Sequence, residues 1–170
     1  MSMDNKYKDK RRPENVELRR KIDNLLWEGN SFIKENLQHL EISDYYYEVA
    51  EAIEELSLDE ETIRQLIEDY VIQILKSKIA FYKYIHELKK DELEGKSLDY
   101  TNVRNLAHKN LGVVRNLRIK DAQKLLEVIM HEDDLDYLRL CIKALEISAV
   151  KLNPLCAYET LKLIEVKKSL

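Results

Sequence analysis

The chain has 170 residues, which fits one domain, or one domain with a helical extension. Only 3 glycines and 2 prolines occur, and the abundant Leu, Ile, Lys and Glu favour helices, so we expect an all-α protein. A formal net charge of −4, and no apolar run near the roughly 20 residues that cross a membrane, give no indication of nucleic-acid or membrane binding. The two cysteines, Cys141 and Cys156, form no CxxC pair, which indicates a reducing, cytoplasmic setting.

The N-terminal third is expected to add helices outside a main bundle. Residues 1–12 are polar and basic, lack the apolar segment of a signal peptide, and are predicted to be a flexible tail. Pro13 suits the first position of a helix, and apolar residues recur at helical spacing over residues 18–37. Gly29-Asn30 is a candidate break in this helix. We therefore expect a helical extension over residues 13–56.

The end of this extension carries an unusual mixture of tyrosines and acids. Ser43 is the expected N-cap of a short helix that includes Tyr46 and Ile53. The tyrosine run at 45–47 is interpreted as a half-buried packing surface, with a docking surface as the alternative. Residues 41–61 hold nine acidic residues and no basic residue, which is most simply a solvated face.

Residues 57–152 are predicted to form an antiparallel four-helix bundle, because four helical patterns follow one another with short connections. Ser57-Leu58-Asp59-Glu60 matches a capping box and opens the longest helix, which Gly95 ends. Ser97 or Asp99 is the expected cap of the second helix. The second, third and fourth helices are expected to end near Leu117, Met130 and Leu152. Asn153-Pro154 then begins a C-terminal helix over residues 153–170.

One histidine lies on the polar face of the second bundle helix. With ~100° per residue, the apolar stripe is centred near Asn110, and His108 lies about 160° away from it. Arg104 and Gly112 lie one turn to either side of His108. Residues 100–120 hold five Lys or Arg and no acid. We therefore expect a solvent-facing imidazole on a basic helix, and a buried hydrogen-bond partner for Asn110.

This arrangement fits a phosphoryl carrier better than a self-contained enzyme. An exposed imidazole needs no triad to attack a phosphoryl group that is already activated. Phosphoryl transfer requires positioning and positive charge, which Arg104 and Arg115 could supply, and Gly112 would allow close approach of a partner. The sequence has no Walker A or GxGxxG motif. We therefore expect no ATP-binding segment, no cofactor and no metal site.

The stretch Arg104-Asn105-Leu106-Ala107-His108-Lys109-Asn110-Leu111-Gly112-Val113-Val114-Arg115-Asn116-Leu117 resembles the signature of histidine-containing phosphotransfer (Hpt) domains. In that family, one helix of a four-helix bundle typically reads L-A-H-x-L-K-G-x-x-x-N-L. The resemblance covers residues 57–152 and matches His108 to the phosphorylated histidine and Gly112 to the small residue beside it. The family usually has lysine where this chain has Leu111, and an apolar residue where it has Asn110.

The resemblance implies a stand-alone phosphotransfer protein of a bacterial-type phosphorelay. A response-regulator receiver domain would pass a phosphoryl group from its aspartate to His108, and a second receiver would collect it. The receiver would bring the magnesium ion, a hybrid histidine kinase is a further candidate partner, and nothing requires more than a monomer. The residues expected to contact the phosphoryl group or the receiver are Arg104, Lys109, Leu111, Gly112 and Arg115.

Two alternative functions stay open. The first is a phosphorylation-incompetent relative that binds a receiver or kinase as an inhibitor or adaptor. The second is a helical assembly protein without phosphoryl chemistry, which predicts an exposed apolar groove near Leu26, Phe32 and Leu37. Trp27 and Phe32 are expected to help the N-terminal helices to pack on the bundle, rather than to mark a ligand pocket. A buried His108 would count against both phosphorelay hypotheses.

Overall fold

The computed structural model describes residues 13–168, so the predicted tail at residues 1–12 lies outside the described residues. The described part contains seven α-helices, one short 3-10 helix and no strand, which confirms the all-α prediction. The elements are α2 (Pro13–Asn36), η2 (Gln38–Leu40), α3 (Val49–Leu56), α4 (Glu60–Leu93), α5 (Thr101–Leu117), α6 (Lys120–Ile129), α7 (Leu135–Leu152) and α8 (Pro154–Lys168).

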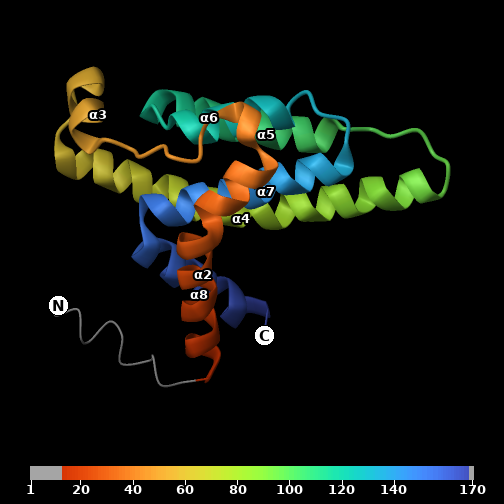
Figure 1. Ribbon diagram of the computed structural model, residues 1–170, viewed down its shortest axis with the longest axis horizontal. Helices are drawn as coiled ribbons and strands as arrows, with labels where there is room; N and C mark the ends of the chain where they lie inside the picture. Colours follow the sequence, from red (N-terminus) through yellow and green to blue (C-terminus); the bar gives the residue numbers. More distant parts are fainter. Residues whose placement is uncertain (1–12, 169–170) are drawn as a thin grey trace.

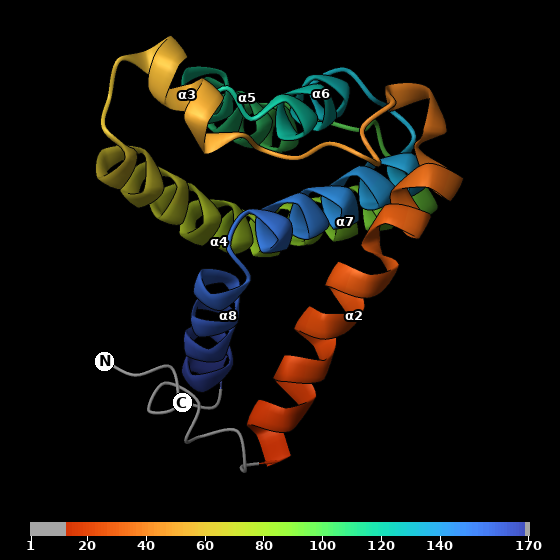
Figure 2. The same ribbon diagram turned by 60° about the vertical axis from the view of Figure 1, so that its left-hand side comes forward.

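The helices α4, α5, α6 and α7 contact one another in a closed order. Each contacts the next along the chain, and α7 returns to contact α4. Figures 1 and 2 show α5 and α6 on one side of the α4–α7 pair, and α2 and α8 extending away from its other side. The short helix α3 packs on α4. The helix α2 contacts α7, the helix α8 contacts both α4 and α7, and α2 and α8 contact each other.

A single apolar core runs through all of these elements. Buried residues of α4, α5, α6 and α7 form its centre, and it continues through Leu18, Ile22 and Ile33 of α2 and Ala157 and Leu161 of α8. The apolar faces of α2 and α8 are buried in the same core, because α2 packs onto α7 and α8 packs onto α4 and α7.

Most helix boundaries in the second half of the chain agree with the sequence predictions. The exception is the start of α5, whose N-cap is Tyr100 and not Ser97 or Asp99. Gly95 follows the end of α4 with a positive φ of 70°, a conformation that glycine adopts without steric cost. The helices α6 and α7 lie within one residue of their expected ranges. The Asn153 side chain accepts a hydrogen bond from the Cys156 amide at 3.0 Å, as expected of a residue that caps α8.

Several predictions in the first half are wrong. The cap of α4 is Asp59, whose carboxylate accepts a hydrogen bond from the Thr62 amide at 2.7 Å, whereas Ser57 ends α3 in a left-handed conformation. The helix α2 is continuous through Gly29-Asn30, so the expected break is absent. Gly29 instead lies against Ile147 of α7, where there is no room for a Cβ atom. The helix α3 begins at Val49, which leaves Tyr46 in the preceding segment.

The expected roles of the N-terminal apolar residues are confirmed only in part. Phe32 packs against the core, but the side chain of Trp27 is 88% exposed and packs on nothing in the described core, so its predicted role is wrong. Leu37 is fully buried, whereas Leu26 is exposed. A groove lined in part by Phe32 and Ile147 opens between α2 and α7, so an exposed groove near Phe32 is present, but Leu37 has no part in it. No helix in the described range is long and apolar enough to cross a membrane.

Candidate functional site

His108 lies on the exposed face of α5, as the sequence predicts. The opposite side of this helix is buried through Val103, Ala107, Val114 and Leu117, whose spacing follows the helical repeat. The His108 side chain has no hydrogen bond or ion pair with any described residue. Both ring nitrogens are therefore available to a partner molecule.

Asn110 anchors the same helix from its buried side. Its side chain is fully buried and accepts a hydrogen bond from Gln73 Nε2 of α4 at 3.0 Å. Its own Nδ2 donates to Ser77 Oγ at 3.2 Å and to the Leu106 carbonyl at 2.9 Å. The predicted hydrogen-bond partners of this buried amide are thus confirmed, and they fix the rotation of α5 that keeps His108 outward.

Gly112 leaves an open surface one turn beyond His108. A Cβ atom placed on Gly112 would have no neighbouring atom within 4 Å. Glycine in the interior of a helix costs about 0.5–1 kcal/mol relative to alanine. Because no contact within the described part of the protein requires glycine at position 112, the packing of the chain does not explain why this residue is not alanine.

Two arginines near His108 are held by acids of the same chain. Arg104 donates to Asp133 at 2.8 Å, and its guanidinium lies 5.0 Å from the centre of the Tyr100 ring. Arg115 forms an ion pair with Glu127 of α6 at 3.3 Å. Both pairs are solvent-exposed, and exposed pairs contribute only ~0–1 kcal/mol. A phosphoryl group could therefore compete for either arginine.

Two acidic residues of α3 form ion pairs with the C-terminal end of the basic stretch at residues 100–120. Glu55 of α3 contacts Arg118 at 3.4 Å, and Glu51 contacts Lys120 at 3.2 Å. Lys109, next to His108, is the basic residue of the 100–120 stretch that has no carboxylate partner among the described residues. The positive charge that α5 presents beside His108 is thus concentrated on Lys109.

Leu111 is the one predicted site residue that the structure removes from the surface. Its side chain is 2% exposed and belongs to the apolar core. The prediction that it contacts a phosphoryl group or a receiver is therefore wrong. The physical reason is that both Asn110 and Leu111 face inward, so the buried face of α5 is wider than the predicted stripe.

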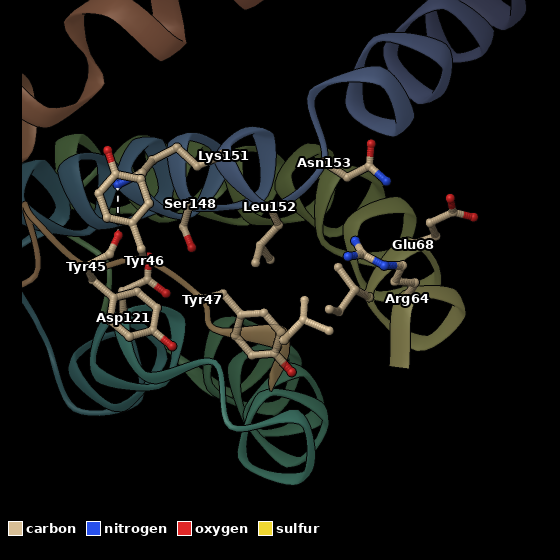
Figure 3. A pocket seen from close by; sticks show the side chains of 12 residues that line it. Tyr45, Tyr46, Tyr47, Arg64, Glu68, Asp121, Ser148, Lys151, Leu152 and Asn153 are labelled. Atoms are coloured by element: carbon tan, nitrogen blue, oxygen red, sulfur yellow. Dashed lines mark hydrogen bonds between the residues drawn. The ribbon is translucent and has the colours of Figure 1, made fainter. Parts of the chain in front are cut away.

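A second feature, which the sequence did not single out, is a cavity beside the tyrosine segment (residues 45–47). Tyr47 Oη donates to the Leu117 carbonyl at 2.7 Å, and Tyr45 Oη accepts from the Lys120 amide at 3.2 Å. Burial raises the pKa of Tyr47 to about 12. Figure 3 shows how these side chains, with Ser148 and Lys151 of α7, surround the cavity.

Sequence reasoning could have found one signal of this cavity. Asp121 falls on the apolar face of α6, at helical spacing from Leu125 and Ile129, where a carboxylate is out of place. Two of the tyrosines are half-buried, as predicted. Their hydrogen-bond partners, in the turn between α5 and α6, lie about 70 positions further along the chain, so no local sequence pattern indicates these contacts.

The other reactive side chains are poorly placed for chemistry. Cys141 is buried and Cys156 is half-buried, and both are free thiols. Burial raises the pKa of Cys141 to about 12, so its thiol stays protonated and a poor nucleophile. Within residues 13–168, no group of three His, Cys, Asp or Glu side chains is arranged to hold a metal ion.

Comparisons of the chain with protein-family models, with curated proteins and with solved structures found no match.

Proposed function

We propose that this protein is a phosphoryl carrier that docks receiver domains on α5 and takes up the phosphoryl group on His108. The observation that carries the proposal is that an exposed imidazole without a partner in the described chain lies one helical turn from Gly112. No contact within the described part of the protein requires a glycine at that position. A glycine one turn from a nucleophile allows a partner's surface to come close to it. The resemblance of residues 104–117 to the Hpt signature supports the same role.

The contacts among the helices also support this proposal. The closed order of contacts from α4 through α5 and α6 to α7 is compatible with an Hpt-like four-helix bundle over residues 57–152. In such a bundle, the helix that carries the nucleophile is held on one side by its neighbours and exposes the other. The Asn110 hydrogen bonds to α4 give α5 that rigidity, and rigid support keeps a nucleophile oriented.

The transfer itself requires little from this chain. A nitrogen of His108 attacks the phosphorus of a receiver's aspartyl phosphate, a P–N bond forms, the P–O bond to the aspartate breaks, and the aspartate leaves as a carboxylate. The proton of the attacked imidazole goes to solvent. Lys109 can stabilise the phosphoryl oxygens directly, and Arg104 and Arg115 can do so after leaving Asp133 and Glu127. Magnesium, where it is needed, would come with the receiver.

Phosphoryl transfer from a panel of phosphorylated receiver domains of the same organism tests this proposal. We expect label on the wild-type protein and on a His131→Gln control, since His131 is exposed in the turn after α6, but none on His108→Gln. Label that persists on His108→Gln would contradict the assignment. Complementary charge mainly speeds and orients the encounter of the receiver with this protein. The rate of phosphoryl transfer should therefore fall as the salt concentration increases.

A second candidate function is an adaptor that binds a receiver without being phosphorylated. The observation that favours it is the pairing of Arg104 with Asp133 and of Arg115 with Glu127, together with the burial of Leu111 where the Hpt family has a lysine. The same receiver panel separates the two functions. Binding that weakens with salt and with Lys109→Gln, without label on any histidine, would favour the adaptor.

A further inference from the structure

A cavity of about 170 Å³ opens between the tyrosine segment, the start of α6 and the end of α7. Val49, Ile67 and Leu152 give it an apolar wall, and the Tyr47 ring lies along one side. Arg64 and Glu68 of α4 lie at the end opposite Tyr45 and Lys151 (Figure 3). A cavity of about 150 Å³ accommodates benzene, so this space can hold a small molecule.

Asp121 places a buried carboxylate in the wall of this cavity. Its Oδ1 accepts a hydrogen bond from the Ala122 amide at 2.7 Å, but no Lys, Arg or His of the described chain forms an ion pair with it. Burial raises the pKa of Asp121, and Ser148, the Ala122 amide and Lys151 offset this only in part. A buried carboxylate without a cation is costly, so the site favours a ligand that brings one.

Ser148 lies beside Asp121 in the wall of the same space. Its side chain is 2% exposed, and its hydroxyl interacts with the Asp121 carboxylate and so lowers the pKa of Asp121, but it forms no other hydrogen bond within the described chain. Figure 3 shows its hydroxyl directed into the cavity. A hydroxyl that faces a carboxylate can also accept a hydrogen bond, so Ser148 can contact an ammonium group that binds at Asp121.

Lys151 provides the opposite charge at the same end of the cavity. Its ammonium donates to the Tyr45 carbonyl at 3.2 Å and to Asn30 Oδ1 at 3.0 Å. Two of its three N–H donors are used in these bonds, and the ammonium also lies 5.2 Å from the centre of the exposed Tyr46 ring, a cation–π contact for which a ligand carboxylate can compete. The Lys151 and Asp121 charges are close enough to affect each other's pKa but form no ion pair. The cavity thus offers separate sites for a cation and an anion.

We propose that this cavity binds a small zwitterion of the α-amino acid type. Its ammonium is held by Asp121 and Ser148, its carboxylate by Lys151, and a short aliphatic side chain lies against Ile67 and Leu152. The two charges of an α-amino acid match the separate cation and anion sites, and the apolar wall and the volume suit a side chain of the size of valine. This inference is independent of the function proposed for His108.

Nuclear magnetic resonance titration of the full chain tests the proposal with L-valine, isobutylamine and 3-methylbutanoate. The last two probes lack the carboxylate and the amine of valine, respectively. We expect saturable shifts of the Ala122 and Tyr47 amides with valine, and binding of each single-charge probe that is about tenfold weaker or more. Asp121→Asn should weaken valine binding to a similar extent, and Ser148→Ala severalfold, because each removes a partner of the ammonium.

The control is Asp136→Asn, which changes an exposed carboxylate at the start of α7 and should leave valine binding unchanged. Ser148→Ala keeps the size of the side chain nearly constant, so it tests the site even if Asp121→Asn perturbs folding. Three outcomes would overturn the proposal: no saturable shift with valine, equal binding of isobutylamine or 3-methylbutanoate, or a cavity that holds water only.

Discussion

The Gln73 side chain of α4 donates a hydrogen bond at 3.0 Å to the fully buried side-chain oxygen of Asn110 on α5. This bond joins the helix that carries His108 to the longest helix of the protein. Because Asn110 lies two residues after His108, its attachment on the inner side sets which way the imidazole faces. A polar residue at the centre of an apolar stripe thus acts as an orienting contact.

Replacing Asn110 with alanine should reduce the free energy of unfolding by about 2–4 kcal/mol. The change leaves the buried Ser77 and the half-buried Gln73 without their hydrogen-bond partner and creates a small cavity. Urea unfolding followed by circular dichroism measures the effect. Asn116→Ala, at an exposed position of the same helix, is the matched control and should stay within ~0.5 kcal/mol of the wild type.

Gly112 and Gly29 should respond in opposite ways to substitution by alanine. Gly112→Ala should stabilise the fold by about 0.5–1 kcal/mol, because its Cβ meets nothing and alanine favours helix. Gly29→Ala should destabilise it by ~1–3 kcal/mol, because its Cβ would lie 2.5 Å from Ile147 Cγ2.

The same Gly112 variant also tests the docking surface. If a receiver approaches α5 closely at this point, Gly112→Ala should slow phosphoryl transfer while it raises the melting temperature. A variant that is both more stable and equally fast in transfer would show that the open surface at Gly112 has no part in docking.

The hydroxyl of Tyr47 should matter more than that of Tyr46. Tyr47→Phe removes the 2.7 Å hydrogen bond to the Leu117 carbonyl and should cost about 1 kcal/mol of stability, within the range of ~0.5–1.5 kcal/mol for such bonds. Tyr46→Phe serves as the control, because this ring is exposed and its contact with the Lys151 ammonium does not need the hydroxyl. Equal stabilities of the two variants, measured by urea unfolding, would contradict the assigned role of Tyr47.

Asp121 should make the protein less stable as the pH rises from about 4 toward neutral. Burial raises the pKa of its carboxyl above the ordinary value of 3.8, so in this window the folded state binds more protons than the unfolded state. Asp121→Asn removes this term, and its stability relative to the wild type should increase with pH. Urea midpoints measured across this range provide the test, and a difference that shrinks toward neutral pH would contradict the burial account.

Local patterns were sufficient for the end of α5 and for both ends of α6 and α7, because the signals there are local. Helical spacing, Gly95 after α4 and Asn153 before α8 each act within a few residues of the boundary that they mark. They also placed His108 on the outside. The same patterns misplaced the cap of α4, because Ser57 and Asp59 both suit an N-cap, and Ser57 instead ends α3.

Long-range contacts account for what the sequence could not predict. Periodicity placed Leu111 beside the polar face that carries His108 and outside the apolar stripe, but the packing of α5 against two neighbouring helices buries a wider face. The charge pattern predicted a basic helix, but not that Glu51, Glu55, Glu127 and Asp133 would pair with its cations. The Asp121 cavity brings together four segments that lie far apart in the chain.

The most direct test of the central proposal is the ³¹P magnetic resonance spectrum of the protein after incubation with a phosphorylated receiver domain. We predict a phosphohistidine signal that survives base and disappears in acid, present in the wild type and in His131→Gln but absent from His108→Gln. A signal that persists in His108→Gln, or no signal with any receiver of the organism, would contradict the assignment of His108 as the phosphoryl acceptor.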